Sequence, residues 1–241
     1  MAEGMWLIPL EGIGEIAPGD DLASVVADAV APANPSGPTL LAGDVVVITQ
    51  KVVSKAEGRI VPIDPDDPAA KEALIEQESV RVVRRRGDLI ISETRHGFVC
   101  ANAGIDLSNV SPGTAALLPV DPDRSARRLR AGLRATLGVN VGVIVSDTFG
   151  RPWRQGVTDV AIGCAGVAGV IDLRGTPDAN GRELVATEVC IADELASAAE
   201  LVMGKDRGIP AAIVRGVPAS WLRPSSVQAE IIRPSGEDLF R

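Results

Sequence analysis

Oxygen-bearing and basic side chains gather in one stretch, SDTFGRPWRQGVTDVAIG, which begins at Ser146 directly after the apolar run Val139–Val145. The apolar run predicts a buried strand, so we expect Asp147 and Thr148 in a turn-rich loop at its end. Their oxygen atoms suit a divalent cation, and a neighbouring guanidinium suits a phosphate. The stretch could therefore hold a metal–phosphate group. It could also be an ordinary turn whose Asp and Thr satisfy backbone donors.

Two arginines, Arg151 and Arg154, add positive charge to the same stretch. Guanidinium groups bind carboxylates and phosphates through paired hydrogen bonds. From charge and position we take both arginines, together with Asp147, as candidate catalytic residues that would meet a substrate carboxylate or phosphodiester. In the alternative interpretation they are solvated outside an ordinary turn.

A second polar stretch, NAGIDLSNV, follows a predicted strand and contains Asn102, Asp106, Ser108 and Asn109 within eight residues. One carboxylate with neighbouring amides and a hydroxyl suits a Mg²⁺ or Mn²⁺ site, or contacts to a ribose and base. Asn-Ala-Gly and Ser-Asn are also common turn formers, so a purely structural role stays open.

A third candidate, QKVVSKAEGRIV, follows the apolar β-branched run Gly43–Thr49. Lys51 and Lys55 are four residues apart, so they share one face if the chain turns helical there. Their ammonium groups could then meet a phosphate, or they could be a pair of solvated lysines. The Walker A motif GxxxxGK[ST] is absent, because Gly204-Lys205 is followed by an aspartate.

The bulk composition limits the kind of protein. The chain has 241 residues, of which 46% are hydrophobic and 23% charged, with a formal net charge of -8. This composition predicts a globular protein, and the negative charge disfavours nonspecific binding to nucleic acid or to an acidic membrane. Three dispersed cysteines and the lack of a signal peptide predict a cytoplasmic protein with small buried thiols.

Strands and helices alternate irregularly, which predicts an α+β or mixed α/β fold with a mixed sheet. We expect the tail Arg223–Arg241 to lie on the surface, and Leu89–Ser92 to form a hairpin with Gly97–Ala101. The predicted strands are Met5–Leu10, Gly43–Thr49, Leu89–Ser92, Gly97–Ala101, Val139–Val145, Leu184–Cys190 and Ile209–Val214. The predicted helices are Leu22–Ala31, Pro68–Arg86, Asp121–Leu137 and Ile191–Met203.

Several of these stretches together resemble the coenzyme F420:L-glutamate ligases, also called γ-glutamyl ligases of F420 biosynthesis. The resemblance rests on GDVVVITQKVVSKAEGRIV, NAGIDLSNV, LLPVDPDRSARRLR, VIVSDTFGRPWRQGVTDVAIG, ELVATEVCIADELASAAELVMGK and GIPAAIVRG, which cover almost the whole chain in the family's order. The chain is similar to the N-terminal ligase part of a two-domain actinobacterial form. We expect residues 1–241 to be one ligase domain that stops before the flavin domain of that form would begin.

The resemblance implies a GTP-dependent ligase. Such an enzyme activates the terminal carboxylate of a phospholactyl deazaflavin precursor as an acyl phosphate, and the α-amine of L-glutamate then forms an amide. Later glutamates add through γ-linkages. The family implies Mg²⁺ or Mn²⁺, an accessory K⁺, an α+β fold and an intertwined homodimer. A module of another class, which binds nucleotide or deazaflavin without catalysis, is the alternative hypothesis.

The resemblance also implies roles for single residues. Asp106, Asp147 and Thr148 fall at the family's metal positions. The residues at nucleotide positions are Ile13, Gly14, Glu15, Ile16, Gln50, Lys55, Asn109, Gly204, Gly208 and Ile209. Many relatives have serine where this chain has Gln50, and we expect that contact to be altered rather than lost, because an amide both donates and accepts.

Overall fold

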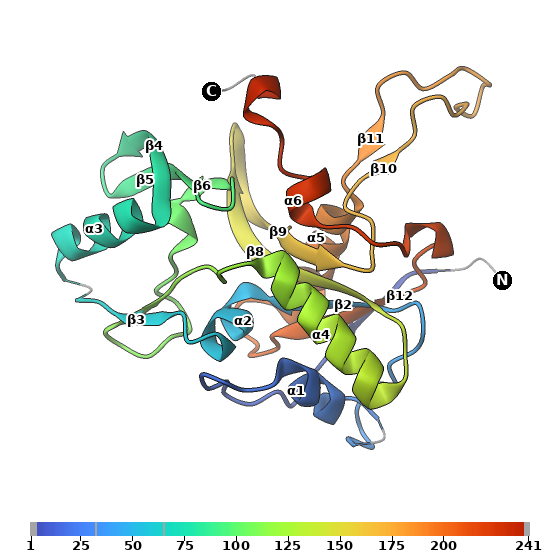
Figure 1. Ribbon diagram of the computed structural model, residues 1–241, viewed down its shortest axis with the longest axis horizontal. Helices are drawn as coiled ribbons and strands as arrows, with labels where there is room; N and C mark the ends of the chain where they lie inside the picture. Colours follow the sequence, from blue (N-terminus) through green and yellow to red (C-terminus); the bar gives the residue numbers. More distant parts are fainter. Residues whose placement is uncertain (1–3, 32, 65, 239–241) are drawn as a thin grey trace.

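A mixed five-stranded sheet forms the centre of the computed structural model, which describes residues 4–31, 33–64 and 66–238 (Figure 1). Only β2 and β8 are parallel neighbours, and the other pairs are antiparallel. The predicted mixed sheet of an α+β fold is therefore confirmed. The strand order is β1 (Trp6–Pro9), β12 (Ala211–Arg215), β2 (Val45–Thr49), β8 (Gly142–Arg151) and β9 (Arg154–Ala165).

The parallel pair β2 and β8 lies at the centre of the sheet. Both strands are runs of β-branched residues that are buried at almost every position before the sheet edge, as expected for central strands. Their register pairs Val45 with Gly142 and Thr49 with Ser146. Parallel strands end at the same edge of a sheet, so the chain after Thr49 and the chain after Ser146 start out side by side.

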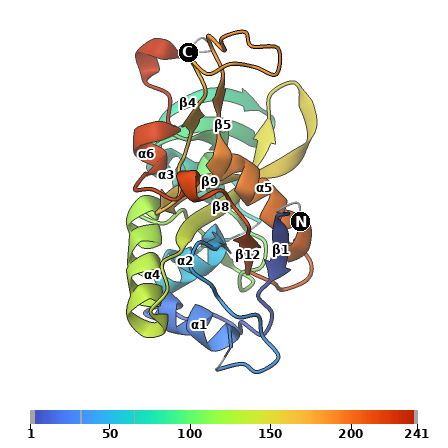
Figure 2. The ribbon, with the colours of Figure 1, turned by 90° about the vertical axis from the view of Figure 1, so that its right-hand side faces the viewer.

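Helices cover the sheet on two sides. Figure 2 shows α4 (Pro122–Leu137) and α5 (Ile191–Met203) on opposite sides of β8 and β9, with α1 (Leu22–Ala29) packed against α4. Asp21 and Asp121 cap the N-termini of α1 and α4, and Gly138 ends α4 in the left-handed conformation. None of the described helices has the length and apolarity needed to cross a membrane.

Smaller elements surround this core. The predicted hairpin is confirmed as β5 (Leu89–Thr94) and β6 (Val99–Ala101). The remaining elements are α2 (Gln50–Ala56), β3 (Ile60–Pro62), α3 (Pro68–Glu78), β4 (Ser79–Arg86), β7 (Thr114–Ala116), β10 (Ile171–Asp172), β11 (Glu188–Val189), α6 (Val227–Glu230) and three 3₁₀ turns at Asn102–Gly104, Ala219–Trp221 and Ser235–Glu237.

The predicted long helix Pro68–Arg86 is wrong in its second half. Helix α3 ends at Glu78, and the remaining residues form β4, which pairs with β5 from Ser79 opposite Thr94 to Arg86 opposite Leu89. The sequence SVRVVRRR is rich in β-branched valine, which favours a strand once a partner is available. The arginines at its end therefore do not complement a helix dipole, and Arg85 instead pairs with Glu72 and Glu76 of α3.

The loop predicted over Ser146–Gly163 is also wrong. Strand β8 continues to Arg151 and returns as β9, so that most of the stretch forms an antiparallel ribbon, with Thr148 opposite Asp159. Trp153, with a φ of 59°, makes the tight turn. Antiparallel pairing satisfies the backbone groups that a loop would have left to water. In Figure 1 this ribbon rises from the sheet toward the top of the view.

Two further expectations change toward the C-terminus. The predicted strand Leu184–Cys190 shortens to β11, because β10 offers only two residues for pairing. The described part of the tail does not simply lie on the surface, because Val227 is buried. The buried carboxylate of Asp123 on α4 accepts the N–H groups of Cys164, Val227 and Gln228, and so ties the tail to α4 and β9.

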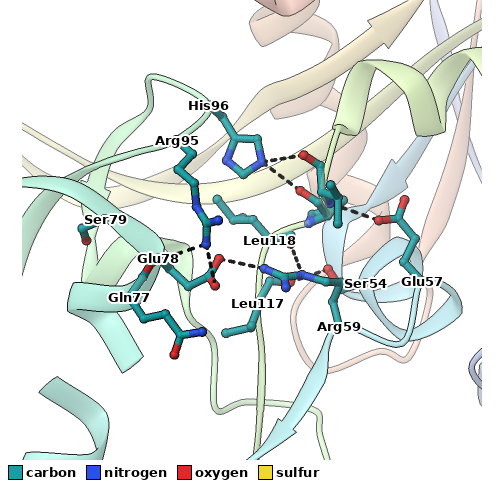
Figure 3. A network of polar contacts seen from close by, with 12 residues as sticks. Ser54, Glu57, Arg59, Gln77, Glu78, Ser79, Arg95, His96, Leu117 and Leu118 are labelled. Carbon is teal, nitrogen blue, oxygen red and sulfur yellow. Dashed lines mark hydrogen bonds and ion pairs between the residues drawn. The ribbon is translucent and has the colours of Figure 1, made fainter. Parts of the chain in front are cut away.

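A polar network fastens the sheet β4–β5–β6 to the core (Figure 3). Glu78 is buried at the end of α3, and its carboxylate oxygens accept hydrogen bonds from Arg59 at 2.7 Å and from Arg95 at 3.1 Å. The ring of His96 lies 2.9 Å from the carbonyl of Pro119 through Nε2. Because a carbonyl only accepts, Nε2 carries the proton. The single histidine thus holds the connection between β7 and α4.

Gly163 should be intolerant of a side chain. A Cβ there would lie 2.3 Å from the carbonyl carbon of Pro122 at the start of α4. We expect Gly163→Ala to lower the free energy of unfolding by about 2–3 kcal/mol, measured by urea denaturation, because overpacking forces the backbones apart. Gly150→Ala is the control, since a Cβ at that position would meet no other atom within 4 Å. Equal midpoints for the two variants would contradict the close packing of α4 on β9.

Glu230 should stabilise the tail in a pH-dependent way. Burial alone would raise the pKa of Glu230, but Arg223 and the N–H of Val170 lower it to about 2. Because the folded pKa lies below the ordinary value of 4.5, the stabilisation is complete above pH 4.5 and is lost as the pH falls toward 2. Relative to wild type, Glu230→Gln should lose about 1–2 kcal/mol at pH 7.

Denaturation of both proteins across this pH range measures the difference. It should shrink steadily as the pH falls from 4.5 toward 2. A difference that stays constant over that range would show that the charge of Glu230 contributes nothing to holding the tail.

Candidate functional site

A cleft of about 700 Å³ opens at the carboxyl end of β2, where Thr49 lines it. Its walls come from the loop before α1, from α2, from the segment after Asp106 and from the end of α5 with the loop that follows it. Among the residues that line it are Ile13, Gly14, Glu15, Ile16, Lys55, Asn109, Gly204, Gly208 and Ile209. The structure therefore brings together every residue expected at a nucleotide position except Gln50.

Three lysines lie in the lining of this cleft, together with the carboxylates of Glu15, Glu200 and Asp206. Lys51 and Lys55 project from α2, as their spacing predicts, and Lys205 projects from the loop after α5. Lys55 forms an ion pair with Glu15 across the cleft at 2.5 Å. The charges of these lysines and carboxylates balance, so the lysines can meet an anion when they exchange their carboxylate partners for it.

Asp106 lies at the margin of the cleft and pairs with Lys51. The distance from Lys51 Nζ to Asp106 Oδ2 is 2.8 Å, and Lys51 also donates to Ser108 Oγ at 2.9 Å. The N–H of Ser108 donates to the other oxygen of Asp106. Burial acts to raise the pKa of Asp106, but these hydrogen bonds outweigh it and lower the pKa below its ordinary value. Asp106 is therefore a carboxylate at neutral pH.

Asp147 lies on β8, one residue beyond its last pairing with β2, and is half-buried. Burial raises the pKa of Asp147 to about 7, the N–H of Thr148 opposes the rise, and the nearby charges of Asp106 and Asp159 add to it. Two residues expected at metal positions are thus close enough to repel each other. A bound cation would relieve that repulsion.

Thr148, the third expected metal residue, is held by Asp159. Its hydroxyl donates to Asp159 Oδ1, while Ser146 Oγ donates to Oδ2 at 2.9 Å. The carboxylate of Asp159 is only 2% exposed. Lys205 Nζ contacts the hydroxyl oxygen of Thr148 and lies 3.5 Å from Asp159 Oδ1. The ribbon β8–β9 therefore holds the hydroxyl of Thr148 beside Lys205 of the cleft.

Gln50 lies outside the cleft lining. Its side chain is fully buried beneath α2, where Nε2 donates to Ser54 Oγ at 2.7 Å and to the carbonyl of Leu117 at 2.9 Å. Its Oε1 is buried without a hydrogen-bond partner among the described residues. In this arrangement the amide supports the backbone under the cleft and does not face it.

Arg151 and Arg154 also lie away from the cleft lining. They are paired with each other at the exposed end of the ribbon β8–β9, on either side of Pro152-Trp153. Arg151 donates to the carbonyl of Gln155 at 3.2 Å. The structure thus separates these arginines from Asp147, because the strand that carries Asp147 continues outward instead of folding into a loop.

Sequence reasoning missed two residues of the site. Lys205 stands out in the sequence only through a failed Walker A match, although a lysine directly after a helix-ending glycine is well placed to face a cleft. Asp159 lies on the apolar strand β9, where a single carboxylate needs a buried partner. The isolated carboxylate of Asp159 within this strand was therefore the sequence signal that could have indicated a buried polar site.

The donor set fits a divalent cation that is shared with a phosphate. Within residues 4–31, 33–64 and 66–238, no three His, Cys, Asp or Glu side chains are placed to hold a metal by themselves. Mg²⁺ is commonly bound by one or two carboxylates together with phosphate and water oxygens. Asp106, Asp147 and the hydroxyl of Thr148 provide such a partial set next to the lysine-lined cleft.

The comparisons with known proteins agree over most of the chain. Residues 12–216 match the family model described as F420-0:Gamma-glutamyl ligase. The Coenzyme F420:L-glutamate ligase of Methanothermobacter thermautotrophicus is 44% identical, over 99% of this chain and 99% of the relative. The protein of the same name from Methanopyrus kandleri is 46% identical, over 97% and 96%. That from Methanocaldococcus jannaschii is 42% identical, over 83% and 85%.

Matches of this extent leave little of the chain outside the shared fold, and they include all the stretches that form the cleft and its carboxylates. The chain belongs to the F420-0:gamma-glutamyl ligase family.

Proposed function

We propose that the protein is a ligase that adds L-glutamate to a deazaflavin precursor in coenzyme F420 biosynthesis, with GTP as the source of energy. The observation that carries the proposal is the identity of 44% over 99% of the chain to a relative named Coenzyme F420:L-glutamate ligase. The cleft supports the same conclusion, since all the residues expected to contact the nucleotide except Gln50 line it together.

The proposed reaction has two steps. A carboxylate oxygen of the precursor attacks the γ-phosphorus of GTP, so that an acyl phosphate forms and GDP leaves. The α-amine of glutamate then attacks the acyl carbon, phosphate leaves, and the amine gives up a proton. Transfer of a phosphoryl group depends mainly on the alignment of the reacting groups and on neutralisation of the phosphate charge. In an acidic protein, that neutralisation needs local cations.

The residues of the cleft meet these needs. Lys55, with Lys51 and Lys205, would neutralise the phosphates of the nucleotide. Asp106, Asp147 and Thr148 would hold a Mg²⁺ or Mn²⁺ ion, which when bound supplies charge neutralisation at the transferred phosphoryl group.

Arg151 and Arg154 stay candidates for the outer part of the substrate, at the end of the ribbon. Gln50 would act on the nucleotide through the backbone that it supports. The homodimer and the accessory K⁺ stay predictions from the family resemblance, and the cytoplasmic location stays a prediction from the cysteines and the lack of a signal peptide.

The mass of the reaction product tests the function directly. With GTP, Mn²⁺, L-glutamate and the deazaflavin precursor, each turnover should add one glutamyl residue, followed over time by mass spectrometry together with the release of GDP. Omission of glutamate is the control for hydrolysis of the nucleotide alone. If intact protein binds GTP but neither a glutamyl product nor GDP appears, the chain is a binding module and the proposal is wrong.

The proposed role of Asp147 in metal binding can be tested with a substitution that keeps the size of the side chain. Asp147→Asn keeps the shape of the side chain but removes its charge, so we expect turnover to fall by about 10²–10³-fold, because metal binding supplies several kcal/mol to the transition state. The melting temperature should stay near that of wild type, since the substitution removes a charge that burial disfavours. Asp88→Asn, in the exposed turn between β4 and β5, is the matched control.

Loss of the fold in Asp147→Asn would instead indicate a structural role for this carboxylate in the ribbon. Unchanged turnover would exclude Asp147 from the metal site.

A further inference from the structure

Two of the oxygen atoms proposed as ligands of a divalent cation, on Asp106 and Thr148, are in contact with lysine ammonium groups. Lys51 Nζ lies 2.8 Å from Asp106 Oδ2. Lys205 Nζ contacts Thr148 Oγ1 and also lies 3.5 Å from Asp159 Oδ1 and 3.9 Å from Glu200 Oε1. A cation that binds Asp106 or Thr148 therefore meets a positive charge at contact distance.

Lys51 and Lys205 differ in how easily their ammonium groups can move away from these oxygen atoms. The side chain of Lys51 is only 13% exposed, and Ser108 gives it a second partner. The side chain of Lys205 is 52% exposed and projects from a loop that begins at Gly204 after the end of α5. An exposed lysine on its flexible four-carbon stem can move its ammonium group to another partner without moving the backbone.

A polyphosphate in the cleft would offer that partner. Lys205 lines the same 700 Å³ cleft as Lys55 and Lys51. Transfer of its ammonium to a phosphate oxygen frees the hydroxyl oxygen of Thr148 and places positive charge where the nucleotide is negative. Asp159 and Glu200 are the carboxylates that lie nearest to its ammonium, and its charge also acts on Asp147.

We propose that Lys205 is a positioning residue that couples the binding of the divalent cation to the binding of the nucleotide. Its ammonium acts as the counter-ion of Asp159 and covers the hydroxyl oxygen of Thr148, and it exchanges places with the cation when the phosphates bind. The inference rests on the proposed function, since it takes GTP and a divalent cation as the ligands.

The coupling has a defined signature. Removal of the ammonium should strengthen the binding of the cation alone, because the competitor is gone, and weaken the binding of the nucleotide alone, because a phosphate partner is gone. By linkage, each ligand should then enhance the affinity of the other in the wild type more than in the variant. A residue with a merely structural role would weaken both ligands.

Lys205→Met tests this with Mn²⁺ and GTP as probes. Free Mn²⁺ is measured by electron paramagnetic resonance, and GTP binding by calorimetry, each with and without the other ligand. We expect Lys205→Met to bind Mn²⁺ without GTP about tenfold more tightly than wild type, and GTP without metal about tenfold more weakly. Lys71→Met, on α3 and outside the cleft lining, should match wild type.

Lys205→Arg, which keeps the positive charge, should retain the weak Mn²⁺ affinity of the wild type. The inference is overturned if Lys205→Met leaves the Mn²⁺ affinity unchanged or lowers both affinities while the wild type still forms glutamyl product, and in that case the proposed function stands. If the wild type binds neither GTP nor Mn²⁺ and forms no product, the proposed function fails and the inference fails with it.

Discussion

The pairing of β2 with β8 is the constraint on which the site depends. Because the strands are parallel and in register from Val45–Gly142 to Thr49–Ser146, their continuations leave the sheet at one edge. One continuation becomes α2 and carries two lysines, while the other carries Asp147 and Thr148 outward along the ribbon. A shift of this register by one residue would turn the side chains of one strand to the opposite face and separate the lysines from the carboxylates.

Charge pairing around that edge offsets part of the cost of burying the carboxylates of the site. Buried carboxylates are costly unless they are paired, and here Asp106 pairs with Lys51 while Asp159 receives two hydroxyl groups and lies near Lys205. Asp147 is the exception, because burial and the charges of Asp106 and Asp159 outweigh the N–H of Thr148 and the charge of Lys205, and its pKa rises to about 7. Groups with a perturbed pKa of this kind are common in the active sites of enzymes.

The sequence predicts the elements of the core better than the way they present the site. Helices α1, α4 and α5 begin within one residue of their predicted starts, and β2 follows from its β-branched run, since these signals are local. The predictions for the end of α3 and for the ribbon β8–β9 are wrong, because both structures depend on strand partners that a local pattern does not reveal. The same limit explains why the predicted position of Arg151 and Arg154 near Asp147 is wrong, because their position depends on how far strand β8 continues before it turns back. It also explains Gln50, whose direction depends on the carbonyl of Leu117.

The outer strand β1 has a consequence for how the chain acquires its function. Trp6 of the first strand pairs with Arg215 of β12, far away in the sequence. Pairings between such distant residues slow folding. The loop Ile13–Ile16, which follows β1, forms one wall of the cleft, so the cleft is complete only when this pairing has formed. A ligand in the cleft would therefore bind the finished fold and not its partly folded forms, which makes ligand occupancy a stabiliser of the whole chain.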